Sequence, residues 1–476
     1  MKDNLGKPPK ARRTAMCLLA VVLTAVSCSL FRPDPRQSPE GALPRTFALY
    51  MPGAARPDKW WEEFRDPELN ALVEEALSGS FTLQEAWARL NQAQAVAVQV
   101  GSAFYPDLTA TGGSAYGRQR TENGVQRTRT VKDYSLGIFS NYELDLWGRI
   151  RSERETARLA ANATREDLNG AAITLAAEVT QRWANIISQN MQKRLLERQL
   201  QTNLIFLELV ELRFRKAMVS ALDVYQQRQV VEQVKAEIPL VEQREQLLRH
   251  ELALLLGKPP RTALDIQRET IPIPVDIPDT GLPADLLAAR PDVRAAGLRL
   301  RAADWQVAAA RADRLPAISL TAGGSFGAEK MDLLFNNWLL SLAGNLTAPI
   351  FDGYRRAAEV DRTRAVVDEN LAFYRETVLT AIKEVEDALI SETKQREHIQ
   401  GLERQISAAR NALKQASERY RSGLNDYLPV LTQLLAVQGL ERDLIQQQTF
   451  LLIDRINLYR ALGGAWVQSL APAARQ

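Results

Sequence analysis

The sequence is nearly free of the residues that build metal sites and disulfide frameworks. Its 476 residues include only two cysteines and two histidines, and no HExxH motif occurs. These absences exclude a disulfide-stabilised scaffold and give no support to a zinc enzyme. A phosphate-binding loop is also lacking, because the Gly-rich stretch AGGSFGAEK from Ala322 is predicted as a strand and hairpin. We therefore expect no catalytic activity and no bound cofactor or metal.

Long hydrophobic runs are also lacking, since none reaches the roughly 18 residues of a membrane-spanning helix. The one continuous apolar run ends at Val26 after a basic start, which is typical of a secretory signal peptide over residues 1–27. The next residue but one, Cys28, completes a stretch that resembles a bacterial lipobox, with Ala25 where a leucine is usual. That resemblance implies cleavage before Cys28 and a covalent lipid, such as palmitate, on its thiol. Ser29 then favours sorting to the outer membrane, whereas a plain secretory signal with an incidental cysteine is the alternative.

No excess of one charge sign remains in the mature chain. The net charge of the full sequence is +3, and the signal peptide holds five basic residues and one acidic residue. Removing it leaves a chain close to neutral. Because acidic and basic residues alternate along the predicted helices, no nucleic-acid surface is indicated.

What the sequence does contain is a long internal repeat. The stretch LRFRKAMVSALDVYQQ from Leu212 matches ERYRSGLNDYLPVLTQ from Glu418 at an offset of 206 residues, and the match continues without a gap to Gly463. Upstream, the residues from Leu83 match those from Val293 at an offset of 210. We therefore predict a tandem duplication.

Each unit has the same order of predicted elements: a helix, a β-hairpin, and two long helices joined by the repeated turn. The predicted ranges are helices 66–103 (with a break near Gly79) and 283–314, strands 107–116, 131–144, 317–326 and 338–350, hairpin loops 117–130 and 327–337, and long helices 149–216 and 354–422. The alternation of apolar and polar residues in the second strand of each hairpin is typical of transmembrane β-strands. Asn425 or Asp426 is expected to cap the last helix.

This organisation predicts six segments along the chain. They are the signal peptide (1–27), an extended N-terminal segment (28–65), the first repeat (66–257), a Pro-rich linker (258–283), the second repeat (284–464) and a C-terminal tail (465–476).

Four transmembrane strands cannot close a barrel by themselves. The smallest such barrels have eight strands, and lipid does not tolerate an open sheet edge. If these strands lie in a membrane, several copies must therefore build one barrel. Three copies would supply twelve strands and twelve helical passages.

The sequence resembles the TolC-like outer membrane factor family, in its lipoprotein (NodT-type) branch. The motifs that carry the resemblance are WWEEFRDPELNALVEEAL from Trp60, LDLWGR from Leu144, RPDVRAAGLRLRAADWQVAAARADRLPAISL from Arg290, PIFDGYRR from Pro349, RYRSGLNDYLPVL from Arg419 and NLYRALGGAW from Asn457. The resemblance implies a mostly α-helical chain with transmembrane β-strands that forms a homotrimer. Its twelve-stranded β-barrel in the outer membrane would join a twelve-helix periplasmic α-barrel about 100 Å long.

The function implied by this resemblance is passive export through the exit duct of a tripartite efflux pump. The implied partners are outer-membrane lipid, a periplasmic adaptor (membrane fusion) protein and an inner-membrane transporter of the RND type, which supplies the energy. The alternative is a periplasmic helical scaffold or adaptor without a channel, which would use only the helical hairpins. The sequence does not distinguish a drug, a metal or another solute as the cargo.

The resemblance also implies a gate at the periplasmic tip. In related lipoproteins a leucine ring narrows the tip, and an aspartate one helical turn later forms a charged ring. Leu428 stands at the leucine position and Thr432 at the aspartate position, so carboxylates would have to come from Asp426 or Asp223. A narrow leucine ring excludes hydrated ions, whereas packing of Leu428 between coiled-coil helices is the alternative.

Adaptors of this family dock at the repeated turns, which implies a docking edge there. Its candidate residues are Arg215, Ala217 and Met218 in the first turn, and Arg421, Gly423 and Leu424 in the second. The alternative is that the small residues only permit a tight turn.

Overall fold

The computed structural model describes residues 33, 46–47, 58–122, 126–274, 277–278, 280–281 and 283–470. The predicted signal peptide, the lipidation site Cys28 and the last six residues of the predicted tail lie outside the described residues. In the part of the chain that is described, no helix is both long enough and apolar enough to cross a bilayer.

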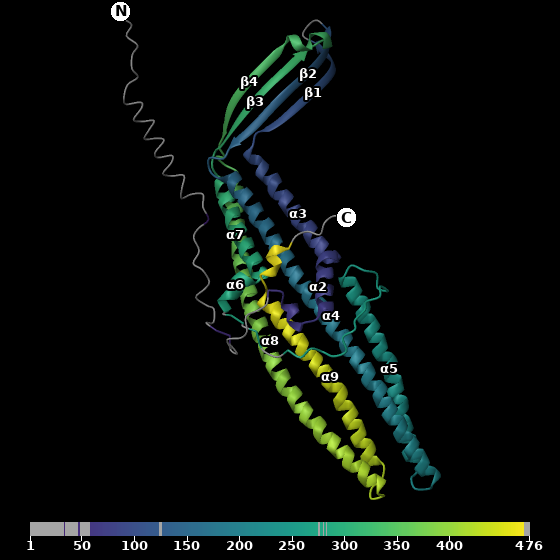
Figure 1. The fold of residues 1–476 in the computed structure, drawn as a ribbon. Helices are drawn as coiled ribbons and strands as arrows, with labels where there is room; N and C mark the ends of the chain where they lie inside the picture. Colours follow the sequence, from purple (N-terminus) through teal and green to yellow (C-terminus); the bar gives the residue numbers. More distant parts are fainter. Residues whose placement is uncertain are drawn as a thin grey trace, which may run out of the picture. The chain divides into compact units, whose positions relative to one another are not determined.

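Both halves of the chain contain the same succession of elements, which confirms the predicted duplication (Figure 1). The first half consists of η2 (Trp60–Phe64), α2 (Pro67–Gly79), α3 (Phe81–Gly101), η3 (Ser102–Phe104), β1 (Asp107–Glu122), β2 (Gln126–Leu144), α4 (Arg149–Arg215) and α5 (Ala221–Leu255). The second consists of η4 (Pro283–Asp285), α6 (Leu286–Ala289), α7 (Pro291–Ala312), β3 (Ala317–Ala328), η5 (Met331–Asn336), β4 (Trp338–Thr347), α8 (Arg355–Arg421), α9 (Leu428–Leu462) and η6 (Trp466–Ser469). The helices α4 and α8 each have 67 residues, and α5 and α9 each have 35.

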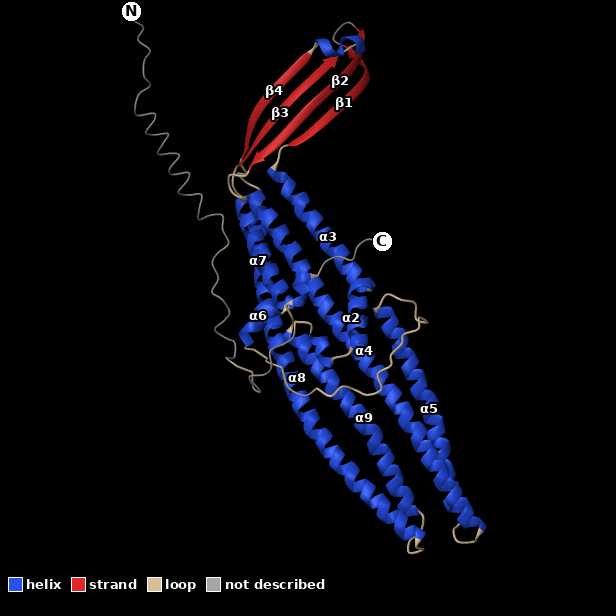
Figure 2. Ribbon diagram, in the orientation of Figure 1, coloured by secondary structure: helices blue, strands red, loops and turns tan. Residues whose placement is uncertain are grey.

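Two compact units cut across the two repeats. One unit holds both β-hairpins with the helical segments next to them, in residues 90–164 and 295–375. The other holds the described residues of 39–89, 165–294 and 376–476, which include both helical hairpins. Strands and helices are distinguished in Figure 2.

The helix that opens the second repeat differs from its prediction. A continuous helix was predicted over 283–314, but α6 and α7 are separated at Arg290, which has extended backbone angles (φ −90°, ψ 123°). Pro291 follows directly, and a proline disfavours helical geometry in the residue before it. The corresponding break in the first repeat is at Ser80, next to the predicted Gly79.

The two hairpins form one antiparallel sheet in the order β1-β2-β3-β4. Residues that pair directly share a face, and β2 joins the hairpins through pairs such as Ile138 with Gly324. One face exposes Leu108, Leu136, Ile138, Leu320, Leu340, Leu342 and Leu346. The other carries Thr109, Thr111, Ser135, Asn141, Ser319, Thr321, Ser341 and Asn345, with Phe139 and Leu339 as large apolar exceptions. The sheet therefore has an apolar face, a mostly polar face and two edges, β1 and β4.

The first hairpin is longer than predicted. The expected loop over 117–130 is wrong, because β1 continues to Glu122 and β2 starts at Gln126 with backbone pairing throughout. The hydrogen bonds between paired strands join backbone groups. Polar side chains therefore do not by themselves end a strand. The second loop is confirmed, with η5 between β3 and β4.

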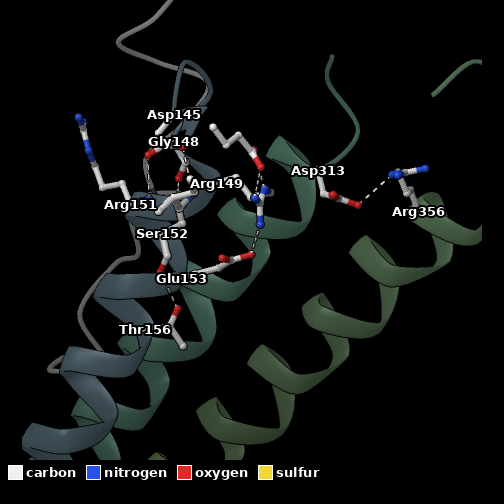
Figure 3. A network of polar contacts seen from close by, with 11 residues as sticks. Asp145, Gly148, Arg149, Arg151, Ser152, Glu153, Thr156, Asp313 and Arg356 are labelled. Atoms are coloured by element: carbon white, nitrogen blue, oxygen red, sulfur yellow. Dashed lines mark hydrogen bonds and ion pairs between the residues drawn. The ribbon is translucent and has the colours of Figure 1, made fainter. Parts of the chain in front are cut away.

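Polar contacts anchor the hairpins to the helices that follow them (Figure 3). Asp145 accepts hydrogen bonds from the backbone N–H groups of Ile150 (3.0 Å) and Arg151 (2.8 Å) in the first turn of α4. Arg149 forms ion pairs with Glu143 at the end of β2 and with Glu153 in α4, both at 2.8 Å. In the second repeat Arg356 pairs with Asp313 (2.9 Å) and Asp352 (3.1 Å). The start of α4 is thus fixed beside the end of β2, and the start of α8 beside the end of α7.

A buried ion pair fastens α8 to α9. The Arg455 guanidinium donates two hydrogen bonds, of 3.0 and 2.7 Å, to the Glu392 carboxylate, and the two side chains are 1% and 0% exposed. Arg396 also donates to Glu392 (2.8 Å) and to the Pro274 carbonyl oxygen (2.7 Å). Through Arg396, the buried pair is therefore connected to the linker between the repeats.

Replacing Glu392 with glutamine should destabilise the second unit by about 3 kcal/mol, because it leaves the Arg455 charge buried without a carboxylate. Chemical denaturation of the detergent-solubilised protein measures this change. Asp387→Asn is the matched control, since it removes a carboxylate that pairs with Lys383 on the exposed side of the same helix. Equal denaturation midpoints for the two variants would contradict a special role for the buried pair.

Candidate functional site

The turns that end α4 and α8 have the same backbone. Ala217 (φ 55°) and Gly423 (φ 73°) both adopt left-handed geometry. The Met218 N–H donates to the Arg213 carbonyl oxygen, and the Leu424 N–H to that of Arg419, both at 2.9 Å. This closure of a helix end usually uses glycine, so Ala217 keeps it at a cost of about 1 kcal/mol.

The predicted docking residues lie together on these two turns. These residues are all exposed: Arg215, Ala217, Met218, Arg421, Gly423 and Leu424. Met218 and Leu424 occupy equivalent positions directly after the left-handed residue, and Arg215 and Arg421 end their helices. Each turn thus presents one apolar side chain and one guanidinium group.

Arg213 holds the two turns side by side. Its guanidinium donates to the carbonyl oxygens of Tyr420 (2.9 Å) and Arg421 (3.1 Å), and it lies 4.2 Å from the centre of the Tyr420 ring. These carbonyl groups belong to the last turn of α8, where helix geometry supplies few N–H donors, and the Tyr420 oxygen also accepts from the Gly423 N–H (3.1 Å). Sequence reasoning missed this contact, because nothing in the repeat pairs Arg213 with a residue about two hundred positions away.

The predicted gate leucine does not pack inside its own chain. Leu428 is the first residue of α9 and its side chain is 56% exposed, which is contrary to the alternative of packing between the coiled-coil helices of one chain. Thr432 is exposed one turn later, and its hydroxyl donates to the Leu428 carbonyl oxygen (2.9 Å). Leu222 occupies the equivalent position in α5 and is 63% exposed. Sequence reasoning missed Leu222 as a gate candidate, although the offset of 206 residues places it on Leu428.

The two candidate carboxylates have different surroundings. Asp223 belongs to a capping box at the start of α5, where its carboxylate accepts from the Ser220 backbone N–H (3.0 Å). Asp426 is exposed between α8 and α9. The expected side-chain cap of α9 by Asn425 or Asp426 is wrong, because the helix starts after Tyr427 without one and the Asn425 amide oxygen accepts from Arg419 instead (3.2 Å).

Two tyrosines separate the turns from the interior of the hairpins. The rings of Tyr420 and Tyr427 lie 5.4 Å apart within a cluster that includes Val224, Val430 and Leu431. Burial raises the pKa of Tyr427, so its hydroxyl stays protonated and can donate a hydrogen bond. No group of three His, Cys, Asp or Glu residues suited to a metal ion occurs among the described residues.

Comparisons with known proteins agree with this architecture. The family model described as "Outer membrane efflux protein" matches residues 72–258 and 282–464. The chain is 32% identical over 431 residues to the pyoverdine export outer membrane protein OpmQ of Pseudomonas aeruginosa, covering 88% of this chain and 90% of the relative. It is also 32% identical over 460 residues to outer membrane protein OprJ of Pseudomonas aeruginosa, covering 94% and 95%. The solved structure of the outer-membrane channel OprN matches with a TM-score of 0.85 and 28% identity, over 92% of this chain and all of that one.

Arg213→Ala should loosen the end of α8, because charge-assisted hydrogen bonds to two carbonyl groups are lost, each contributing about 1.5–3 kcal/mol. We expect amide hydrogen exchange in residues 421–427 to become at least about tenfold faster. Mass spectrometry of the exchanged peptides measures this. The control is Arg215→Ala, which removes an exposed arginine two residues away and should leave the exchange unchanged; an equal effect of both variants would sink the assignment.

Proposed function

The chain belongs to the outer membrane efflux protein family, and on that basis we propose that it is the exit duct of a tripartite efflux system, assembled from three copies. The observation that carries this proposal is the sheet, which has one apolar face, one polar face and two edge strands. Backbone groups at a sheet edge have no water to bond in lipid, so every edge in a membrane must be paired. Pairing β4 of one copy with β1 of the next satisfies both edges and gives a closed barrel of twelve strands.

The two faces of the sheet fit that arrangement. The exposed leucines of β3 and β4 would face lipid, where burial of apolar surface contributes about 25 cal/mol per Å². The threonine, serine and asparagine side chains of the opposite face would line a water-filled lumen. A periplasmic scaffold or adaptor, the alternative function, would have no use for a sheet whose apolar face is exposed.

The long helices would continue the duct into the periplasm. In a trimer, α4, α5, α8 and α9 supply twelve helical passages around one axis. Leu428, exposed in the single chain, would then face its two copies and close the tip as an apolar constriction. Leu222 adds a second leucine per copy. Position 432 carries a threonine where related proteins have an aspartate. Asp426 is therefore the group that would supply charge beside the constriction.

We assign adaptor docking to the paired turns. Met218 and Leu424 offer apolar contact, and Arg215 and Arg421 offer guanidinium groups to carboxylates or carbonyl oxygens of a periplasmic adaptor. The adaptor would connect the duct to an energy-consuming inner-membrane transporter, which we propose to be of the RND type. Transport through the duct itself would then be passive and need neither catalysis nor a cofactor.

The cargo would be a small molecule selected by the transporter. The relative OpmQ is named for the export of pyoverdine, and a wide lumen does not need to bind its cargo. A lipid on Cys28 would hold each copy to the outer membrane in addition to its strands, because a single acyl chain gives only marginal anchoring by itself.

Leu428→Ala should open a leak in the closed trimer. Removing three large side chains from a narrow constriction admits water, so we expect the resting conductance in a planar bilayer to rise by roughly tenfold. The control is Leu254→Ala, which truncates another exposed leucine, near the C-terminal end of α5 and away from the tip. A monomeric wild-type protein that passes no ions would overturn the duct, and an unchanged conductance of a trimeric Leu428→Ala variant would overturn only the gate.

Gly423→Trp should abolish export while the trimer still forms. A Cβ at Gly423 meets no atom within 4 Å, so an indole projects outward into the proposed docking edge. Gly423→Ala is the matched control, since Ala217 shows that alanine fits this backbone in the first repeat. Drug or dye accumulation in cells that rely on this duct measures export, and export retained by the tryptophan variant would exclude docking at this turn.

A further inference from the structure

The residue that precedes the gate leucine is held by a buried chain of hydrogen bonds. Tyr427 is 1% exposed, although Leu428 beside it is 56% exposed. The Tyr427 hydroxyl donates to the Gln227 side-chain oxygen at 2.7 Å. Because the two residues are consecutive, the position of the tyrosine fixes where the leucine side chain begins.

The chain of hydrogen bonds continues through three helices. Gln227 in α5 donates from its amide nitrogen to the Asn203 backbone carbonyl oxygen in α4 at 2.8 Å. The Asn203 side chain then exchanges two hydrogen bonds of 3.2 Å with Gln438, three turns further along α9. Gln227, Asn203 and Gln438 are 0%, 0% and 4% exposed. A buried amide that loses its partner is strongly disfavoured, so these bonds select one position of α9 against α4 and α5.

This hydrogen-bond chain is not part of the duplicated pattern. At the offset of 206 residues, Tyr427 corresponds to Ala221, Asn203 to Ala409 and Gln438 to Glu232. The turns themselves are duplicated with the same backbone, so the extra bonds are not required to make the turn. They occur only where the start of α9 meets the first helical hairpin.

We propose that Tyr427 and Gln227 form a gate clamp, in which Gln227 acts through Tyr427 to position Leu428 in the closed tip. The clamp rests on the proposed gate at Leu428. It adds that the closed position of the leucine depends on one hydrogen bond, from a hydroxyl group to an amide oxygen, inside each copy. Opening the tip then requires this bond to break, while the Asn203–Gln438 pair further along α9 keeps the helices joined. Both clamp residues are positioning residues, since neither is exposed to the lumen.

The test is Tyr427→Phe in the full-length trimer, which keeps the ring and removes only the hydroxyl. We expect a roughly fivefold rise in resting planar-bilayer conductance, the equilibrium shift typical of one lost buried hydrogen bond. Tyr420→Phe is the matched control, because its hydroxyl is buried in the same cluster without a hydrogen-bond partner among the described residues. It should leave the conductance unchanged.

A double variant separates positioning from general destabilisation. Gln227→Leu alone removes the same bond to Tyr427, so the leak of Tyr427→Phe combined with Gln227→Leu should not exceed that of Gln227→Leu alone. Additive leaks, or an equal leak in Tyr420→Phe, would overturn the clamp in favour of general loosening. If Leu428→Ala leaks and a trimeric Tyr427→Phe does not, the clamp is wrong and the gate stands. If Leu428→Ala does not leak, the gate and the clamp fail together.

Discussion

Backbone hydrogen bonding at the edges of the four-stranded sheet constrains the rest of the molecule. Among the described residues, the strands β1 and β4 each have one side without a partner strand, while the apolar face between them favours lipid. In the proposed duct, identical chains complete the sheet and so satisfy both properties. If the strands are shared among copies as proposed, each copy also contributes its long helices to the same assembly. The arginine contacts at the start of α4 and α8 fix each helix against a neighbouring element, the end of β2 for α4 and the end of α7 for α8.

Within the helical unit, the two repeats are joined by hydrogen bonds between uncharged side chains as well as by apolar packing. Along α4 and α9, Gln181 bonds to Asn457, Ser188 to Thr449, and Gln199 to the Gln438 backbone. Such contacts are directional, so they fix the register of one helix against the other, and they depend little on salt. The buried Glu392–Arg455 pair performs the same task between α8 and α9. The repeats can therefore keep one register although the apolar residues alone would permit several.

Most of the fold could be predicted because it follows from periodicity. The duplication set the order of elements, and the alternation in residues 131–144 and 338–350 set the strands. The extension of β1 and β2 could not be predicted, since polar residues such as Arg118 also suit a turn. Capping of α9 by Asn425 was expected from local preference, but a contact with Arg419 across the same turn replaced it. The Tyr427–Gln227 bond lay beyond prediction because it joins residues that only the folded chain brings together.

The two helical hairpins start their return helices in different ways. The start of α5 has a capping box built from Ser220 and Asp223, whereas α9 begins without any side-chain cap. Helix ends that lack such a cap fray more readily. The first turn of α9 therefore depends on the buried Tyr427 and its bond to Gln227 of α5, so loss of that contact would fray this turn while the capped start of α5 stayed intact. The two duplicated hairpins thus hold their return helices by different means: α5 by a cap within its own first turn, and α9 by a contact with the first repeat.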